Sequence, residues 1–124
     1  MVESLLICTA VVPADGIADS CKALSAHGDR PWSPEQQALL LEVLPQVTSR
    51  TVWVPVRADP ETGHWSWNDG TAIHAPGFAP GQPDGRSEDP FCAAMNWPDK
   101  RGWVDLPCSG LHGFVCTLPI DGGA

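Results

Sequence analysis

The order of apolar and polar positions divides the chain into strands, two helices and one long irregular segment. Residues 4–12 form an apolar, partly β-branched run that predicts a first strand. Apolar residues at helical spacing then predict a short amphipathic helix over residues 14–26, which buries Ile17, Cys21 and Leu24. We expect Gly28 to stop this helix.

The second helix carries stronger start and stop signals. Ser33 is a favoured N-cap, Pro34 suits the first helical position, and Gln36 lies three residues after the cap, as in a capping box. Pro45 is expected to end the helix, because proline lacks the N–H that a helical hydrogen bond needs. The predicted buried stripe consists of Leu39, Leu40, Val43 and Leu44.

Four further apolar segments predict strands, at residues 51–54, 64–67, 91–97 and 113–118. Pro55 should end the first of these strands or confine it to a sheet edge. The sequence Asn68-Asp69-Gly70 predicts a tight turn after the second. Residues 71–90 are rich in Gly and Pro and have no apolar periodicity, so they predict a long loop of the kind that often carries function. The predicted class is α+β.

Composition narrows the kinds of partner. The 124 residues include 7 Lys and Arg against 15 Asp and Glu, a net charge of −8, which repels nucleic acid and anionic membrane surfaces but suits a divalent cation. No apolar stretch reaches the roughly 18 residues of a membrane helix, so we expect no membrane insertion. The 12 Gly and 13 Pro approach the level of disordered chains, yet six Trp and five Cys indicate a folded, loop-rich domain.

The cysteines and the N-terminal segment indicate in which cellular compartment the protein is expected. Five cysteines in a small loop-rich chain indicate two disulfides and one remaining thiol, and hence an oxidising environment; composition leaves their pairing open. Residues 5–12 are predicted as a strand and not a signal peptide, because Glu3 stands where a basic region is expected. We therefore expect an extracellular or secreted module, separated from its signal peptide.

Oxygen-bearing side chains of the second half form three clusters. They are Gln82-Pro83-Asp84, Glu88-Asp89 and Asp105. Calcium takes six to eight oxygen ligands, which carboxylates and amides supply. On the residues alone, however, solvated acidic side chains in a loop are the more common interpretation. No nucleophile, zinc-protease or phosphate-loop motif is present, so the sequence predicts no enzyme.

Several motifs together resemble the C-type lectin-like domain family, over nearly the whole chain. They are Cys21-Lys22-Ala23-Leu24, Trp53-Val54-Pro55-Val56, residues 64–71, residues 78–84, Glu88-Asp89, Cys92, Trp103-Val104-Asp105, Cys108 and Phe114-Val115-Cys116. The resemblance implies a single domain over residues 1–124, with two helices packed on small antiparallel sheets and a long loop at about 71–90. It also implies the disulfides Cys21–Cys116 and Cys92–Cys108. Cys8 is then either a buried thiol of the first strand or the site of an intermolecular bridge.

The resemblance further implies a sugar site. Gln82-Pro83-Asp84 is similar to the galactose-type triplet of the family. Carried over, it makes Gln82, Asp84, Glu88 and Asp105 the calcium ligands and the sugar-binding residues. Asp89 corresponds to a ligand of an accessory calcium.

Two departures from the family pattern separate two hypotheses. Val104 replaces an asparagine that binds calcium and sugar, which weakens calcium binding, and Phe78 with Gly85 leaves no obvious aromatic on which galactose could stack. The first hypothesis is a calcium-dependent lectin module for a glycan or glycoprotein. The alternative is a calcium-independent protein-interaction domain on the same fold. We assign no ligand to the tryptophans or histidines of these motifs. The expected packing residues are Trp53, Trp65, Trp67 and Trp103, and the expected surface residues are His64, His74 and His112.

Overall fold

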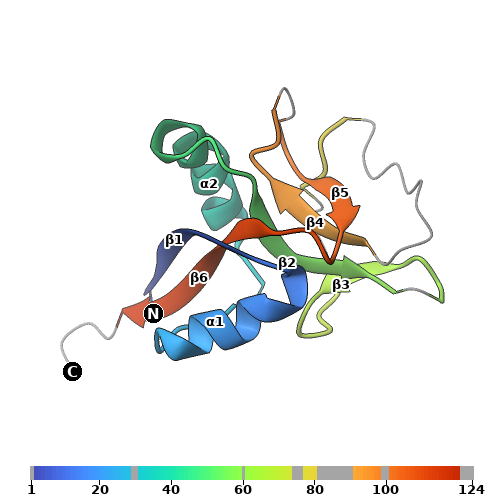
Figure 1. Cartoon of the computed structure of the whole chain (residues 1–124), viewed down its shortest axis with the longest axis horizontal. Coiled ribbons are helices and arrows are strands. Elements are labelled where there is room, and N and C mark those ends of the chain that lie inside the picture. The colour runs from blue at the N-terminus through green and yellow to red at the C-terminus, as the bar shows by residue number, and fades with distance from the viewer. Residues whose placement is uncertain are drawn as a thin grey trace.

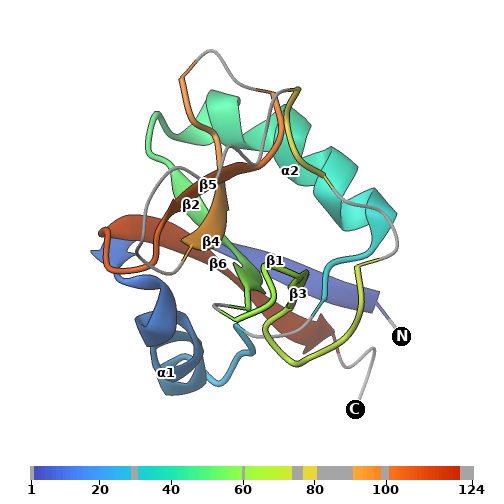
Figure 2. The same ribbon diagram turned by 90° about the vertical axis from the view of Figure 1, so that its right-hand side faces the viewer.

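In the computed structural model, one mixed sheet lies between two helices (Figures 1 and 2). The structure describes residues 2–28, 31–59, 61–73, 77–80, 91–98 and 101–120. Its elements are β1 (Val2–Val12), a 3-10 turn η1 (Ala14–Gly16), α1 (Ile17–Ala23), α2 (Pro34–Val47), β2 (Val52–Ala58), β3 (Trp65–Trp67), β4 (Phe91–Met95), β5 (Val104–Pro107) and β6 (His112–Ile120).

The strand order is β1-β6-β2-β4-β5, with β3 paired to β2. Neighbouring strands are antiparallel except β2 and β6, which meet in parallel at Val52 and Gly113. Three strands converge here. The N–H of Gly113 donates to the carbonyl of Thr51 (3.0 Å), and a Cβ on Gly113 would lie 2.7 Å from the carbonyl oxygen of Cys8. The predicted fold is confirmed, and this contact makes its sheet mixed.

Side-chain alternation along the central strands creates two cores. Val52, Val54 and Val56 of β2 pack on one face of the sheet with Leu40 and Leu44 of α2. The other core contains Trp53 of β2, Ile17 and Cys21 of α1, and Phe114 of β6. Because successive strand residues point to opposite faces, a strand between two helices must be apolar at nearly every position.

Helix α1 ends earlier than predicted, at Ala23 and not at about Ala26. Ser25 adopts a left-handed conformation (φ 58), and the N–H of Ala26 donates to the carbonyl of Cys21 (2.9 Å), as in a Schellman cap. Leu24 therefore lies past the helix and is 51% exposed, which corrects its predicted burial. Gly28 is required for packing, because a Cβ there would lie 2.7 Å from Cγ2 of Ile17.

The start of α2 is confirmed and its end is not. The Gln36 N–H donates to Oγ of Ser33 (3.1 Å), and the Ser33 N–H donates to Oε1 of Gln36 (2.8 Å). The helix runs past Pro45 to Val47, because a proline in the last turn removes only the donor to the Leu41 carbonyl.

The predicted stripe of α2 is only partly correct. Leu40 and Leu44 are buried and Val43 is half-buried, but Leu39 is 50% exposed. The buried face is centred on the i, i+4 pair of Leu40 and Leu44. Leu39 lies outside this face, and its side chain is therefore partly exposed to solvent.

Pro55 neither ends β2 nor lies at a sheet edge. The pairing of β2 with β4 shifts register between Val54 and Arg57, and Pro55 lies in this bulge, where no ladder N–H is needed. Its carbonyl accepts the N–H of Asn68 (2.7 Å). The tight turn that begins at Asn68 is confirmed, with Gly70 at φ 92. Strand β5 was not predicted from its pattern, because it is four residues long and includes an aspartate and a proline.

Both predicted disulfides are present, Cys21–Cys116 and Cys92–Cys108. The first joins α1 to β6 across 95 positions of sequence, and the second joins β4 to the residue after β5 across 16. Cys8 is a free, half-buried thiol on β1, and burial raises its pKa. A raised pKa reduces the thiolate fraction and therefore the reactivity of this cysteine.

Removing the Cys21–Cys116 disulfide should cost more stability than removing Cys92–Cys108, because the longer loop loses more entropy when it is closed in the unfolded chain. We expect losses of roughly 4–5 kcal/mol for Cys21→Ala with Cys116→Ala, and of about 3 kcal/mol for Cys92→Ala with Cys108→Ala. Urea unfolding under non-reducing conditions measures both. Cys8→Ser is the control and should change stability far less. Equal losses for the two double variants would contradict the prediction.

His112 was predicted at the surface but is half-buried, whereas His64 is exposed as predicted and His74 lies outside the described residues. The His112 ring meets the Trp53 indole edge to face, with ring centroids 4.8 Å apart. The Trp53 Nε1–H donates to the carbonyl of Val12 (2.8 Å), which fixes the indole. Burial lowers the pKa of His112 below its ordinary value of 6.5.

This lowered pKa makes stability depend on pH. Above pH 6.5 the His112 ring is neutral in both states and its contribution is fully present. As pH falls through 6.5, the unfolded chain takes up the proton more readily than the folded chain, so stability decreases until the pH is below the folded-state pKa. Denaturant unfolding between pH 8 and roughly pH 5 should therefore show a steeper loss for the native chain than for His112→Phe. Identical slopes would contradict the assignment.

Candidate functional site at β5 and the ends of the long loop

Asp105 is a buried carboxylate on β5, the last strand of the sheet path. It is 6% exposed and lies opposite Ala93 of β4. Alternation along β5 places Asp105 on the same face as Trp103, which belongs to the core beneath α2. Val104 points to the other face and is buried in the core beneath α1. The two side chains therefore leave the strand on opposite sides.

The entry to the long loop is fixed to the residue that precedes β5. The Ala79 N–H donates to the carbonyl of Trp103 (2.9 Å), and the Trp103 N–H donates to the carbonyl of Gly77 (2.8 Å). Two glycines permit this approach. Gly102 has φ 133, and a Cβ there would lie 2.7 Å from the Gly77 carbonyl oxygen; a Cβ on Gly77 would lie 2.8 Å from the Trp103 ring.

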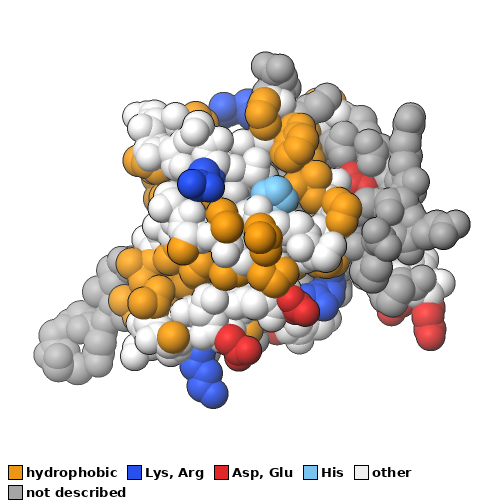
Figure 3. Space-filling view, viewed as in Figure 1, with side chains coloured by type: hydrophobic (Ala, Val, Ile, Leu, Met, Phe, Trp, Pro, Cys, Tyr) orange, Lys and Arg blue, Asp and Glu red, His pale blue; other side chains and the backbone are white. Residues whose placement is uncertain are grey.

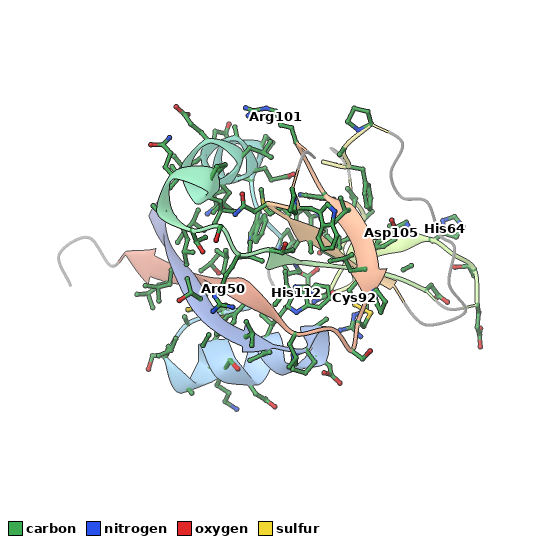
Figure 4. The ribbon with its side chains drawn as sticks, turned by 45° about the horizontal axis from the view of Figure 1, so that its top comes forward. Arg50, His64, Cys92, Arg101, Asp105 and His112 are labelled. Atoms are coloured by element: carbon green, nitrogen blue, oxygen red, sulfur yellow. A yellow bond between two sulfur atoms is a disulfide. The ribbon has the colours of Figure 1, made fainter. Side chains whose placement is uncertain are left out.

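The exit of the loop is fixed to the far end of the same strand. Phe91 pairs with Pro107, and the adjacent Cys92 is bonded to Cys108. The loop entry is thus attached two residues before Asp105, and its exit pairs with β5 two residues after it. Figure 1 shows β4 and β5 side by side, and Figure 4 labels Asp105 at this edge of the sheet. This bracketing places Asp105 beside both roots of the segment that carries the other predicted ligands.

A row of aromatic rings supports this end of the molecule. Ring centroids are 5.0 Å apart for Trp65 and Phe78, 5.3 Å for Phe78 and Trp103, 5.7 Å for Trp103 and Trp67, and 6.3 Å for Trp67 and Trp32. These contacts, with the burial of Trp53, confirm that Trp53, Trp65, Trp67 and Trp103 are packing residues. Phe78 is a half-buried member of the same row. Its ring therefore belongs to the scaffold under the loop.

The predicted ligands fall into two groups. Asp105 is placed as described above, whereas Gln82, Asp84, Glu88 and Asp89 lie outside the described residues. Within the described ranges, no group of three or more His, Cys, Asp or Glu side chains is arranged to hold a metal ion. Asp105 offers the hard oxygen donor that calcium requires, and Val104 offers none.

Gly77 and Gly102 were missed as determinants of this site. The spacing of apolar residues along the chain does not indicate their role. That role is a close backbone approach between segments about 25 residues apart. The position of Gly102 directly before a buried tryptophan is the only local signal.

The family profile described as Lectin C-type domain matches residues 12–118. The chain belongs to the C-type lectin domain family. Relatives of the chain include proteins of different kinds. This C-type lectin domain is 30% identical to a type-2 ice-structuring protein of Brachyopsis segaliensis. The match covers 79% of the domain and 55% of that protein. The domain is 33% identical, over 69% of its length, to an alpha-N-acetylgalactosamine-specific lectin of Patiria pectinifera, with 54% of that protein covered. The domain thus spans about half the length of these relatives.

Solved structures show the same fold at low identity. The carbohydrate-recognition domain of the mouse scavenger receptor C-type lectin matches with a TM-score of 0.79 at 20% identity, covering 98% of this domain and 92% of that chain. A calcium-independent C-type lectin from Saxidomus purpuratus gives 0.77 at 20%, with 98% and 88% covered. A calcium-independent type II antifreeze protein gives 0.73 at 24%, with 94% and 85% covered. Membership of the family therefore does not decide whether calcium is used. In the described part of the chain, no helix is long and apolar enough to cross a membrane.

Substitution of Gly102 by alanine should detach the entry of the loop. The new Cβ would meet the Gly77 carbonyl at 2.7 Å in a backbone conformation (φ 133) that L-residues rarely adopt. We expect a loss of roughly 3 kcal/mol in the free energy of unfolding and faster proteolysis between residues 77 and 91. Gly63→Ala is the matched control, because Gly63 also has positive φ (77) but nothing within 4 Å, and should cost only about 1 kcal/mol. Equal effects of both variants would contradict the close-approach role.

Proposed function

We propose that this C-type lectin domain is a calcium-assisted carbohydrate-binding module whose site combines the long loop with Asp105. The observation that carries the proposal is the attachment of both loop roots beside Asp105, at Trp103 and at Pro107. This attachment brings both roots of the segment that carries the acidic residues next to the buried carboxylate.

The resemblance assigns the ligands within this arrangement. Gln82, Asp84 and Glu88 would each supply one oxygen, and Asp105 would supply its carboxylate and its carbonyl. Calcium takes six to eight oxygens, so these five or so protein atoms leave room for water or sugar hydroxyls. Asp89 is the residue for an accessory ion. The Val104 side chain, buried under α1, cannot complete the set.

A sugar held in this way would coordinate calcium through vicinal hydroxyls and hydrogen-bond to the same side chains. The triplet Gln82-Pro83-Asp84 favours galactose-type ligands, and a relative is named as an alpha-N-acetylgalactosamine-specific lectin. Phe78 is packed between Trp65 and Trp103 and adds little stacking surface, so affinity for a single sugar should be low. The two disulfides suit an extracellular or secreted location.

A second candidate function rests on Val104. A valine side chain offers no oxygen to the calcium set, and related folds include a calcium-independent lectin and a calcium-independent antifreeze protein. A calcium-independent domain that binds a protein ligand through the same loop is therefore the alternative.

Calcium should raise the melting temperature of the domain. A ligand that binds only the folded state stabilises it by RT ln(1 + [L]/Kd), about 2.7 kcal/mol when calcium is at 100 times its Kd. Scanning calorimetry in millimolar calcium and in chelator measures the shift. Asp84→Asn and Glu88→Gln should reduce it, whereas Asp19→Asn, at an exposed position of α1, should not. If calcium leaves the melting temperature unchanged, the calcium-assisted site is rejected in favour of the alternative.

The sugar is tested separately from the metal. Galactose- and mannose-substituted columns, each run with calcium and with chelator, should show retention on galactose that is lost in chelator. If calcium stabilises the domain but neither column retains it, the calcium site stands and galactose and mannose are rejected as ligands. Retention that persists in chelator would reject the metal's role in sugar binding.

A further inference from the structure

Strand β1 lies at one end of the sheet. It is the first strand of the order β1-β6-β2-β4-β5, and within the described residues it pairs with β6 alone (Figures 1 and 2). The candidate carbohydrate site lies at β5, the opposite end of this order. A further strand that joined the sheet at β1 would therefore be added at the end far from the candidate site.

The backbone of Leu5 points away from β6. Leu5 lies opposite Thr117, but the Thr117 N–H donates to the carbonyl of His27 (2.7 Å), and the Thr117 carbonyl accepts the N–H of His27 (2.8 Å). The backbone groups of Thr117 are thus directed to the other side of β6. Leu5 and Thr117 form a non-hydrogen-bonded pair, so the N–H and carbonyl of Leu5 are directed to the open edge of β1.

Glu3 and Ile7 share this backbone direction. Hydrogen-bonded and non-hydrogen-bonded pairs alternate along an antiparallel ladder, and both residues lie two positions from Leu5. The partner of Glu3 on β6 is Pro119, which has no N–H to donate. In the described part of the chain, no backbone hydrogen bond outside the sheet involves Leu5 or Ile7. The outer edge of β1 therefore presents a row of backbone donors and acceptors.

The side chains of β1 are apolar and half-buried on both faces of the sheet. Leu5 and Ile7 lie at the border of the core beneath α2, and Leu6 and Cys8 lie at the border of the core beneath α1. Figure 3 shows hydrophobic side chains gathered on the left of that face, over β1 and β6. Edge strands are usually protected from pairing by charged residues or proline, and residues 4–12 contain neither. One more strand beyond β1 would extend both cores.

A second copy of the chain meets the requirements of this edge. An added strand would border both cores, so it needs apolar side chains on both of its own faces, and β1 is such a strand. Two identical strands that run antiparallel about a two-fold axis also match donor to acceptor. Two chains of net charge −8 repel each other least where charge is absent, and no Lys, Arg, Asp or Glu lies in residues 4–12.

We propose that two copies of the domain join through β1 into one continuous sheet, antiparallel about a two-fold axis at Leu5. The register shift between Cys8 and Val12 limits the regular part of β1 to residues 2–8, and Leu5 is the midpoint. In this register Leu5 pairs with Leu5 of the second copy, and Glu3 pairs with Ile7 of the second copy. Each pair exchanges two backbone hydrogen bonds.

The dimer presents two candidate carbohydrate sites, because β5 of each copy remains at the outer end of the continuous sheet. Two sites of low affinity would gain avidity for a multivalent glycan. This consequence rests on the proposed function, whereas the dimer itself does not.

Sedimentation velocity of the whole chain tests the dimer, from low micromolar to millimolar concentration, in chelator and at 0.15 M salt, where charge repulsion is screened beyond about 8 Å. A single strand pair is a small interface beside the roughly 1,600 Å² of standard ones, so we expect a reversible dimer with a Kd of about 10–100 µM. A chain that remains monomeric at every concentration would overturn the proposal.

Leu5→Lys tests the position of the axis. Two lysines would lie directly opposite each other, and like charges at such positions destabilise a strand pair. The Kd of the dimer should rise at least tenfold, which corresponds to about 1.4 kcal/mol. Leu24→Lys is the matched control, because Leu24 is 51% exposed past the end of α1 and the charge change is equal. It should leave the Kd within about twofold. Melting temperatures show whether both variants fold, and equal weakening by the two would overturn the proposal.

Hydrogen exchange tests the same edge without a substitution. The amides of Leu5 and Ile7 should exchange rapidly in dilute protein and more slowly as the concentration rises. The amides of Leu6 and Cys8, which are directed to β6, should be protected at every concentration. Slow exchange of Leu5 and Ile7 in the monomer would show that another segment of the same chain covers the edge, and would overturn the proposal.

The free thiol reports the register. With the axis at Leu5, Cys8 of one copy lies six positions along the strand pair from Cys8 of the other, or about 20 Å. Oxidation of the native chain should therefore produce no disulfide-linked dimer. Rapid linking through Cys8 would place the axis at Cys8 and overturn the register. Since calcium is absent throughout, none of these results depends on the candidate carbohydrate site.

Discussion

Burial of both faces of the central strands is the constraint on which the rest of the structure depends. Because β2 and β6 lie between α1 and α2, successive residues such as Val52 and Trp53 enter different cores. Strand rotation or slippage by one position would exchange the two cores, so the register is strongly specified. The Cys21–Cys116 bond reinforces it by joining α1 to the strand that pairs with both β1 and β2.

The same constraint shapes the candidate site. On β5, alternation sends Val104 into one core and leaves Asp105 on the face with Trp103. Val104 therefore contributes packing and no ligand atom. The loop is fixed at its roots by backbone hydrogen bonds, a strand pair and a disulfide, and an aromatic row lies beneath its entry. Rigid roots allow a long loop to carry polar groups that the core could not accommodate.

The sequence alone determined the class of fold, the capped start of α2, the turn after β3 and, through its resemblance to the family, both disulfides. These features depend on local signals, such as Ser33 with Gln36, or on motifs that keep their order along the chain. Tertiary structure decided what local pattern could not. Pro55 is accepted in a central strand because a bulge removes the need for its N–H, and Leu39 is exposed because the buried face of α2 is centred elsewhere. The close approach of Gly77 and Gly102, the burial of His112 and the hydrogen bonds of Asn96 all arise where segments distant in sequence meet. No periodicity along one segment records which other segment will lie against it.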